Sequence, residues 1–75
     1  MDNCYKEKYK RLGLNISYYR KLRGLSQEKL AERVDISRTH MSRIETAECS
    51  VSLDVVFALA DALQVEPCKL FEDKE

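Results

Sequence analysis

The stretch SRTHMSRIE, residues 37–45, concentrates hydrogen-bonding side chains in a chain of 75 residues. If it is helical, Met41 and Ile44 fall on one side. The other side then presents short donors and acceptors framed by guanidinium groups: Arg38, Thr39, Ser42 and Arg43, with His40 on the flank. Guanidinium groups and hydroxyls can bind phosphate oxygens and the polar edges of nucleic-acid bases. An isolated polar face could equally be an ordinary solvated surface, so the neighbouring elements must decide.

The neighbouring segments have apolar residues at helical spacing, and the chain contains only two glycines and one proline to interrupt helices. Apolar residues recur at helical spacing over about residues 7–23, and Gly24 follows where a left-handed cap is wanted. Ser26 is suited to cap a second helix, QEKLAERV, and Ser37 to cap the third after the short turn DIS. The second and third helices, about residues 26–45, are therefore predicted to form a helix-turn-helix unit, an arrangement in which the second helix can enter a DNA major groove.

Two further helices complete the predicted architecture. Ser52 is suited to cap LDVVFALADALQ, and Pro67 suits the first position of a short fifth helix, PCKLF. We expect an all-α, compact five-helix bundle in a single domain, 1–75, with its core at about 9–71.

Charge is distributed unevenly although the formal net charge is zero. Residues 1–43 hold eleven Lys and Arg against five Asp and Glu, whereas residues 44–75 hold two against eight. The first part therefore carries +6 and the second −6, which suggests one face meant for an anion.

Several classes of function are disfavoured. Cys4, Cys49 and Cys68 are far apart, and with His40 as the one histidine they give no framework for a zinc site, so we expect no metal or cofactor. No apolar run reaches the roughly 20 residues that span a bilayer, and the charged start is unlike a signal peptide. With no Gly-rich phosphate loop either, the chain is not expected to be an enzyme or to bind a membrane or a small-molecule ligand.

The stretches LGLNISYYRKLRGLSQEKLAERVDISRTHMSRIE and SLDVVFALADALQVEPCKLF resemble the Cro/repressor-type helix-turn-helix DNA-binding family. This family, also called xenobiotic response element-type, has a lambda-repressor-like fold and includes phage repressors and restriction–modification controller proteins. The resemblance implies base contacts from Arg38, Thr39, Ser42 and Arg43, with His40 a weaker candidate. It implies phosphate contacts from Gln27, Ser37 and Ser26, and an ion pair between Arg20 and Glu45 that ties the first helix to the third.

The chain also departs from that family pattern. The loop after the third helix, TAECSV, has no Gly, Lys or Arg, which puts phosphate contacts from the loop in doubt. Asp35 takes the place of the usual Gly in the turn, although Asp tolerates the left-handed conformation better than most residues.

The fourth helix has two apolar faces. Its expected core stripe contains Leu53, Val56, Phe57, Ala60 and Leu63. A second strip, which a monomer does not need, is predicted as a dimer interface together with Phe71: Val55, Ala58, Leu59 and Ala62. Scattered surface alanine and valine would be the plainer explanation.

These observations favour a sequence-specific transcriptional regulator that inserts the helix at about 37–46 into the major groove of a palindromic operator in double-stranded DNA, as a homodimer. We expect it in the cytoplasm of a bacterium or phage host, associated with the nucleoid when bound. The alternative is a protein-interaction or antitoxin-like module, which the acidic C-terminal half would favour and in which DNA binding is secondary.

Overall fold

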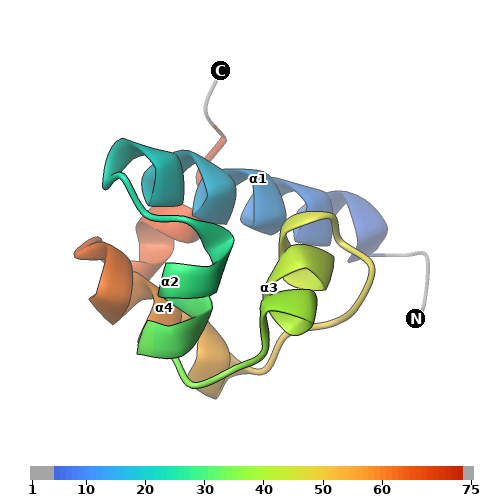
Figure 1. Cartoon of the computed structure of the whole chain (residues 1–75). Helices are drawn as coiled ribbons and strands as arrows, with labels where there is room; N and C mark the ends of the chain where they lie inside the picture. The colour runs from blue at the N-terminus through green and yellow to red at the C-terminus, as the bar shows by residue number, and fades with distance from the viewer. Residues whose placement is uncertain (1–4, 74–75) are drawn as a thin grey trace.

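Helices account for most of residues 5–73, which are the residues described by the structure, a computed structural model. In chain order they are α1 (Lys6–Leu22), α2 (Gln27–Arg33), α3 (Arg38–Glu45), α4 (Leu53–Leu63) and the 3₁₀-helix η2 (Pro67–Phe71). In Figure 1, α1 runs across the top of the view and α2 and α3 lie beneath it. No strand occurs in the described range, so the all-α prediction is confirmed.

The fifth element differs from the prediction, because it is a 3₁₀-helix rather than an α-helix. Pro67 opens it and has no backbone N–H to donate. Five residues leave little room for bonds four residues apart, and the first bond, from Lys69 N–H to the Glu66 carbonyl oxygen, spans three residues at 2.9 Å. The bundle therefore consists of four α-helices and this short 3₁₀-helix within the described residues.

The helix ends follow the local signals in the sequence. The hydroxyls of Ser26, Ser37 and Ser52 each accept a hydrogen bond from the backbone N–H three residues later, at 3.0, 3.0 and 3.2 Å. Gly24 has a φ of 73° just after Arg23, the C-cap of α1, and Asp35 has a φ of 60° in the turn between α2 and α3. All three predicted serine caps and both predicted left-handed positions are confirmed.

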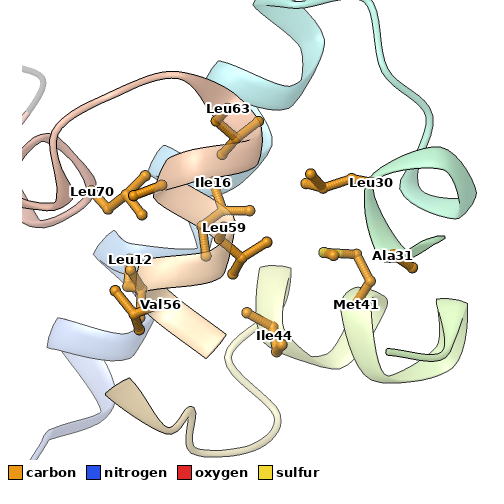
Figure 2. Close-up of a cluster of buried hydrophobic side chains, with 11 residues drawn as sticks. Leu12, Ile16, Leu30, Ala31, Met41, Ile44, Val56, Leu59, Leu63 and Leu70 are labelled. Carbon is orange, nitrogen blue, oxygen red and sulfur yellow. The ribbon is translucent and has the colours of Figure 1, made fainter. Parts of the chain in front are cut away.

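The core draws on every helix of the described chain. Figure 2 shows Leu59 of α4 in the middle of the cluster, whose members are Leu12, Ile16, Leu30, Ala31, Met41, Ile44, Val56, Leu59, Ala60, Leu63 and Leu70. Met41 and Ile44 are 0% and 1% exposed, so the predicted apolar side of α3 is confirmed.

The prediction for α4 is wrong at three residues. Leu59, expected on the outward strip, is 0% exposed, whereas Phe57 and Leu53, expected in the core, are 50% and 64% exposed. The reason is that α4 contacts α1, α2 and η2. These neighbours cover the side of the helix that carries Leu59 and leave Leu53 and Phe57 partly uncovered. A completely buried Leu59 cannot form part of a dimer interface.

Two residues on α1 bring distant segments close together. Asn15 is 1% exposed, and its Nδ2 donates to the carbonyl oxygens of Leu70 and Glu72 at 2.8 Å each, which holds η2 against α1. Gly13 lies against the end of α3, where a Cβ atom would come within 2.5 Å of the Glu45 carbonyl oxygen and 2.7 Å of the Ile44 one. The missing side chain therefore lets α1 pack directly on the backbone of α3.

Candidate nucleic-acid interface

The outer side of α3 presents the five side chains predicted to face DNA bases. Arg38, Thr39 and Arg43 are exposed, and His40 and Ser42 are partly exposed. On the opposite side, the buried Met41 and Ile44 fix the rotation of the helix about its axis.

Both arginines of α3 are available to a ligand. The ion pairs among residues 5–73 are Lys10–Glu7, Arg11–Asp73, Arg20–Glu45 and Lys69–Glu72. Arg38 and Arg43 are in none of them and donate no hydrogen bond from their side chains within this range. Two exposed guanidinium groups without an acceptor on one short helix are suited to binding acceptors outside the protein.

The serines at the starts of α2 and α3 are partly committed to the fold. Ser26 and Ser37 each use an oxygen lone pair to cap a helix. A hydroxyl that accepts in this way still has its O–H to donate. Both side chains are exposed and so remain able to reach a phosphate.

The predicted ion pair is present and holds a further residue. Arg20 Nε lies 2.8 Å from Glu45 Oε2, and Arg20 Nη2 lies 3.2 Å from Glu45 Oε1. The two side chains are 11% and 5% exposed. Gln27 Nε2 donates to the same Glu45 Oε1 at 3.0 Å, and Arg20 Nη1 donates to the Leu25 carbonyl oxygen at 2.8 Å. The network therefore joins α1, the start of α2 and the end of α3.

The bond from Gln27 to Glu45 was not predicted from the sequence, in which Gln27 is expected only to contact phosphate and Glu45 only to pair with Arg20. Gln27 and Glu45 are 18 positions apart and share no helical face, so no periodic signal connects them.

The loop after α3 is held by local hydrogen bonds and by α1. Thr46 Oγ1 donates to Glu48 Oε2 at 2.9 Å, and Ala47 is buried at a φ of 62°, where glycine would be the easier residue. Lys6 Nζ, from the first turn of α1, lies 3.5 Å from the Ala47 carbonyl oxygen. Lys6 of α1 therefore places a positive charge beside this loop, which has no Lys or Arg of its own.

The residues predicted for a dimer interface do not form one continuous surface. Val55, Ala58 and Ala62 of α4 are half-buried, and Ala58 and Ala62 line a shallow pocket together with Arg33. Phe71 is 49% exposed and lies on the opposite flank, where it lines a cavity of about 330 Å³ together with Leu53.

The sequence also predicts that the protein binds no metal and no membrane. Within residues 5–73, no group of three or more His, Cys, Asp or Glu side chains is placed to hold a metal ion. Cys49 and Cys68 are free thiols, and Cys4 lies outside the described residues. None of the helices described is both long and apolar enough to cross a membrane.

Comparison with known proteins gives consistent matches. The HTH_3 family, described as helix-turn-helix, matches residues 16–70. The control protein C.SmaI of Serratia marcescens is 36% identical over 69 residues, covering 92% of this chain and 82% of that protein. The control protein C.BamHI of Bacillus amyloliquefaciens is 44% identical over 49 residues, covering 65% of this chain and 60% of that protein. The crystal structure of the restriction-modification controller protein C.AhdI from Aeromonas hydrophila superposes with a TM-score of 0.83 at 34% identity, covering 87% of this chain and 98% of that one.

Proposed function

The chain belongs to the HTH_3 helix-turn-helix family and is a sequence-specific DNA-binding transcriptional regulator, and we propose that it reads its operator by inserting α3 into the major groove. HTH_3 is not a class of enzymes. The observation that carries the proposal is the pair of free, exposed guanidinium groups on α3, opposite the buried Met41 and Ile44.

The side chains of α3 have separate roles in this proposal. Arg38 and Arg43 bind guanine O6 and N7, and Thr39 contacts a thymine methyl group. Ser42 and His40 take shorter polar contacts at the edge of the groove. Phosphates on either side of the groove are bound by Gln27 and by the hydroxyls of Ser26 and Ser37.

Alanine variants test the base-reading role. Arg43→Ala and Arg38→Ala should each weaken binding to the matched operator by about 1–3 kcal/mol and relax the preference at one base pair per half-site. The operator is first selected from a random DNA pool, and affinities are then measured on matched and mismatched sites. Lys69→Ala, which removes an exposed cation from η2, is the control and should leave the preference unchanged. An Arg43 variant that loses affinity equally on every sequence would make Arg43 a phosphate contact.

We also propose that the protein binds as a homodimer to a palindromic operator. An eight-residue recognition helix covers only one half-site, and two half-sites about 34 Å apart double the contact. The structure exposes large apolar side chains on one flank of α4 and on η2: Leu53 at 64%, Phe57 at 50% and Phe71 at 49%. These three residues, here the α4–η2 patch, replace the predicted strip as the centre of the interface, because Val55 and Ala62 pack partly against the core.

Charge substitutions on the two flanks of α4 decide between the interfaces. Phe57→Glu should give a folded monomer with greatly weakened operator binding, because each substitution enters a two-fold interface twice. Val55→Glu, on the originally predicted strip, should leave the dimer largely intact. Sedimentation equilibrium measures the oligomeric state, circular dichroism shows whether each variant is folded, and a gel shift measures operator binding. A monomer produced by Val55→Glu alone would return the interface to the Val55–Ala58–Ala62 flank, and a wild type that stays monomeric on DNA would rule out the dimer.

We propose a more specific role as a controller of restriction–modification genes, acting in the cytoplasm as one helix-turn-helix domain. The 36% identity to the control protein C.SmaI and the structural match to the restriction-modification controller protein C.AhdI support this role. The selected operator should then lie upstream of genes for a restriction endonuclease and its methyltransferase. If no DNA is retained but a protein partner is recovered, the antitoxin-like alternative is favoured. Retention that weakens steeply with added salt supports DNA binding.

A further inference from the structure

Glu45 accepts more hydrogen bonds than its ion pair with Arg20 accounts for. Its Oε2 accepts from Arg20 Nε at 2.8 Å, while its Oε1 accepts from Arg20 Nη2 at 3.2 Å and from Gln27 Nε2 at 3.0 Å. The carboxylate is 5% exposed and touches groups from α1 and α2 although it ends α3. The third bond comes from Gln27, which starts α2 and is only half-buried.

The chemistry of the carboxylate decides which end of the Gln27 amide faces it. An ionised carboxylate only accepts hydrogen bonds, so the amide must present its nitrogen and not its oxygen. The terminal torsion of a free glutamine is broad and roughly two-fold, so either end can point in a given direction. Toward a phosphate only the nitrogen is useful, because the carbonyl oxygen would face another acceptor. The bond to Glu45 uses one N–H of the amide and leaves the second to donate.

We propose that Glu45 is a positioning residue for DNA binding, which holds the Gln27 amide so that its second N–H points to a backbone phosphate. This inference rests on the proposed function, in which Gln27 contacts DNA. Because Glu45 is the last residue of α3 and Gln27 the first of α2, the bond also fixes the phosphate contact relative to the helix that reads bases. The Arg20 guanidinium pairs with the buried Glu45 carboxylate and offsets its negative charge, so this carboxylate does not repel the DNA.

Nuclear magnetic resonance of the DNA-free protein tests the amide orientation without relying on any DNA contact. The chain has two glutamines, and exposed Gln64 at the end of α4 is the internal reference. One side-chain amide proton of Gln27 should be shifted downfield of its Gln64 counterpart. In the double variant Arg20→Met/Glu45→Leu, which removes the acceptor without leaving a buried charge, the two glutamines should become alike. Indistinguishable Gln27 and Gln64 signals in the wild type would overturn the proposal.

A double-mutant cycle on the selected operator then tests the consequence for binding. Gln27→Met keeps the length of the side chain but removes its donors, and should weaken binding by roughly tenfold per half-site in the wild type. In the Arg20→Met/Glu45→Leu background the same change should weaken binding by less than about threefold, because the amide is no longer held. A purely structural Glu45 would give the same loss in both backgrounds, which would overturn the positioning role while the phosphate contact stands.

A second variant, Glu45→Asp, provides the same test if the Arg20→Met/Glu45→Leu protein does not fold. Glu45→Asp keeps the charge opposite Arg20 but withdraws the carboxylate by one methylene from Gln27. Circular dichroism first establishes that each variant is folded at the temperature of the binding measurement. Glu45→Asp should reduce the effect of Gln27→Met in the same way, and full retention of that effect would contradict the proposal. No effect of Gln27→Met in the wild type would overturn both this inference and the phosphate contact of Gln27.

Discussion

Helix α3 packs mainly against α1 and α2, whereas α4 contacts α1, α2 and η2. In α3 the buried residues are Met41 and Ile44, and the other side is polar and free. In α4 the buried residues are Val56, Leu59, Ala60 and Leu63, with further apolar side chains half-buried or exposed around them. The periodicity of the sequence describes the first helix correctly because the helix has a single packed side. It misplaces residues of the second because several neighbours decide which of its apolar residues are covered.

The largest expected effect comes from the residue that periodicity misplaced on α4. Leu59→Ala should lower the free energy of unfolding by about 3 kcal/mol, because it removes a fully buried side chain from the middle of the core. Phe57→Ala, two residues earlier but half-exposed, should lower it by about 1 kcal/mol. Urea denaturation at one fixed protein concentration measures both, since dimerisation would make stability depend on concentration. Equal losses would mean that the two residues are similarly buried and would return Leu59 to the outward strip.

A smaller effect is expected where α1 packs on the end of α3. Gly13→Ala would normally stabilise a helix by up to about 1 kcal/mol. Here the added methyl group would lie 2.5 Å from the Glu45 carbonyl oxygen, and overpacking of this kind destabilises by about 1–3 kcal/mol. We therefore expect a net loss of stability and weaker operator binding, because α3 must shift. Thermal melts decide the sign, with Leu14→Ala at an exposed neighbouring position as the control. A more stable Gly13→Ala protein would show that α3 does not pack directly on α1.

The smallest effect is expected at the ends of α1 and α4, where matched substitutions should act in opposite directions. Gly24 and Gln64 both follow a helix with positive φ, 73° and 61°. Gln64→Gly should stabilise the protein by about 0.5–1 kcal/mol, because glycine adopts this conformation without strain. Gly24→Ala should destabilise it by about 1 kcal/mol for the same reason, since no other atom lies close to its added methyl group. These changes correspond to shifts of several degrees in Tm for a domain of this size. Shifts of the same sign would mean that contacts at these ends outweigh the conformation of the backbone.

Much of the local structure and the candidate interface could be predicted from the sequence. Serine caps, the glycine after α1 and the turn at Asp35 depend on residues within a few positions of one another, so a linear reading contains the necessary information. The polar side of α3 follows from the positions of Met41 and Ile44 alone. Together with the resemblance to a known family, these signals were enough to predict the helix-turn-helix and the ion pair between Arg20 and Glu45.

Only the tertiary structure decided which distant groups meet. The contact of Gly13 with the end of α3, the bonds of Asn15 to the carbonyl oxygens of Leu70 and Glu72, and the bond of Gln27 to Glu45 each join residues far apart in the chain. The same holds for α4, where the neighbours that surround the helix, and not its own periodicity, bury Leu59 and expose Phe57. Local backbone preferences act over one or two turns of helix, whereas burial and hydrogen bonding across the bundle depend on how whole helices pack, which no short stretch of sequence specifies.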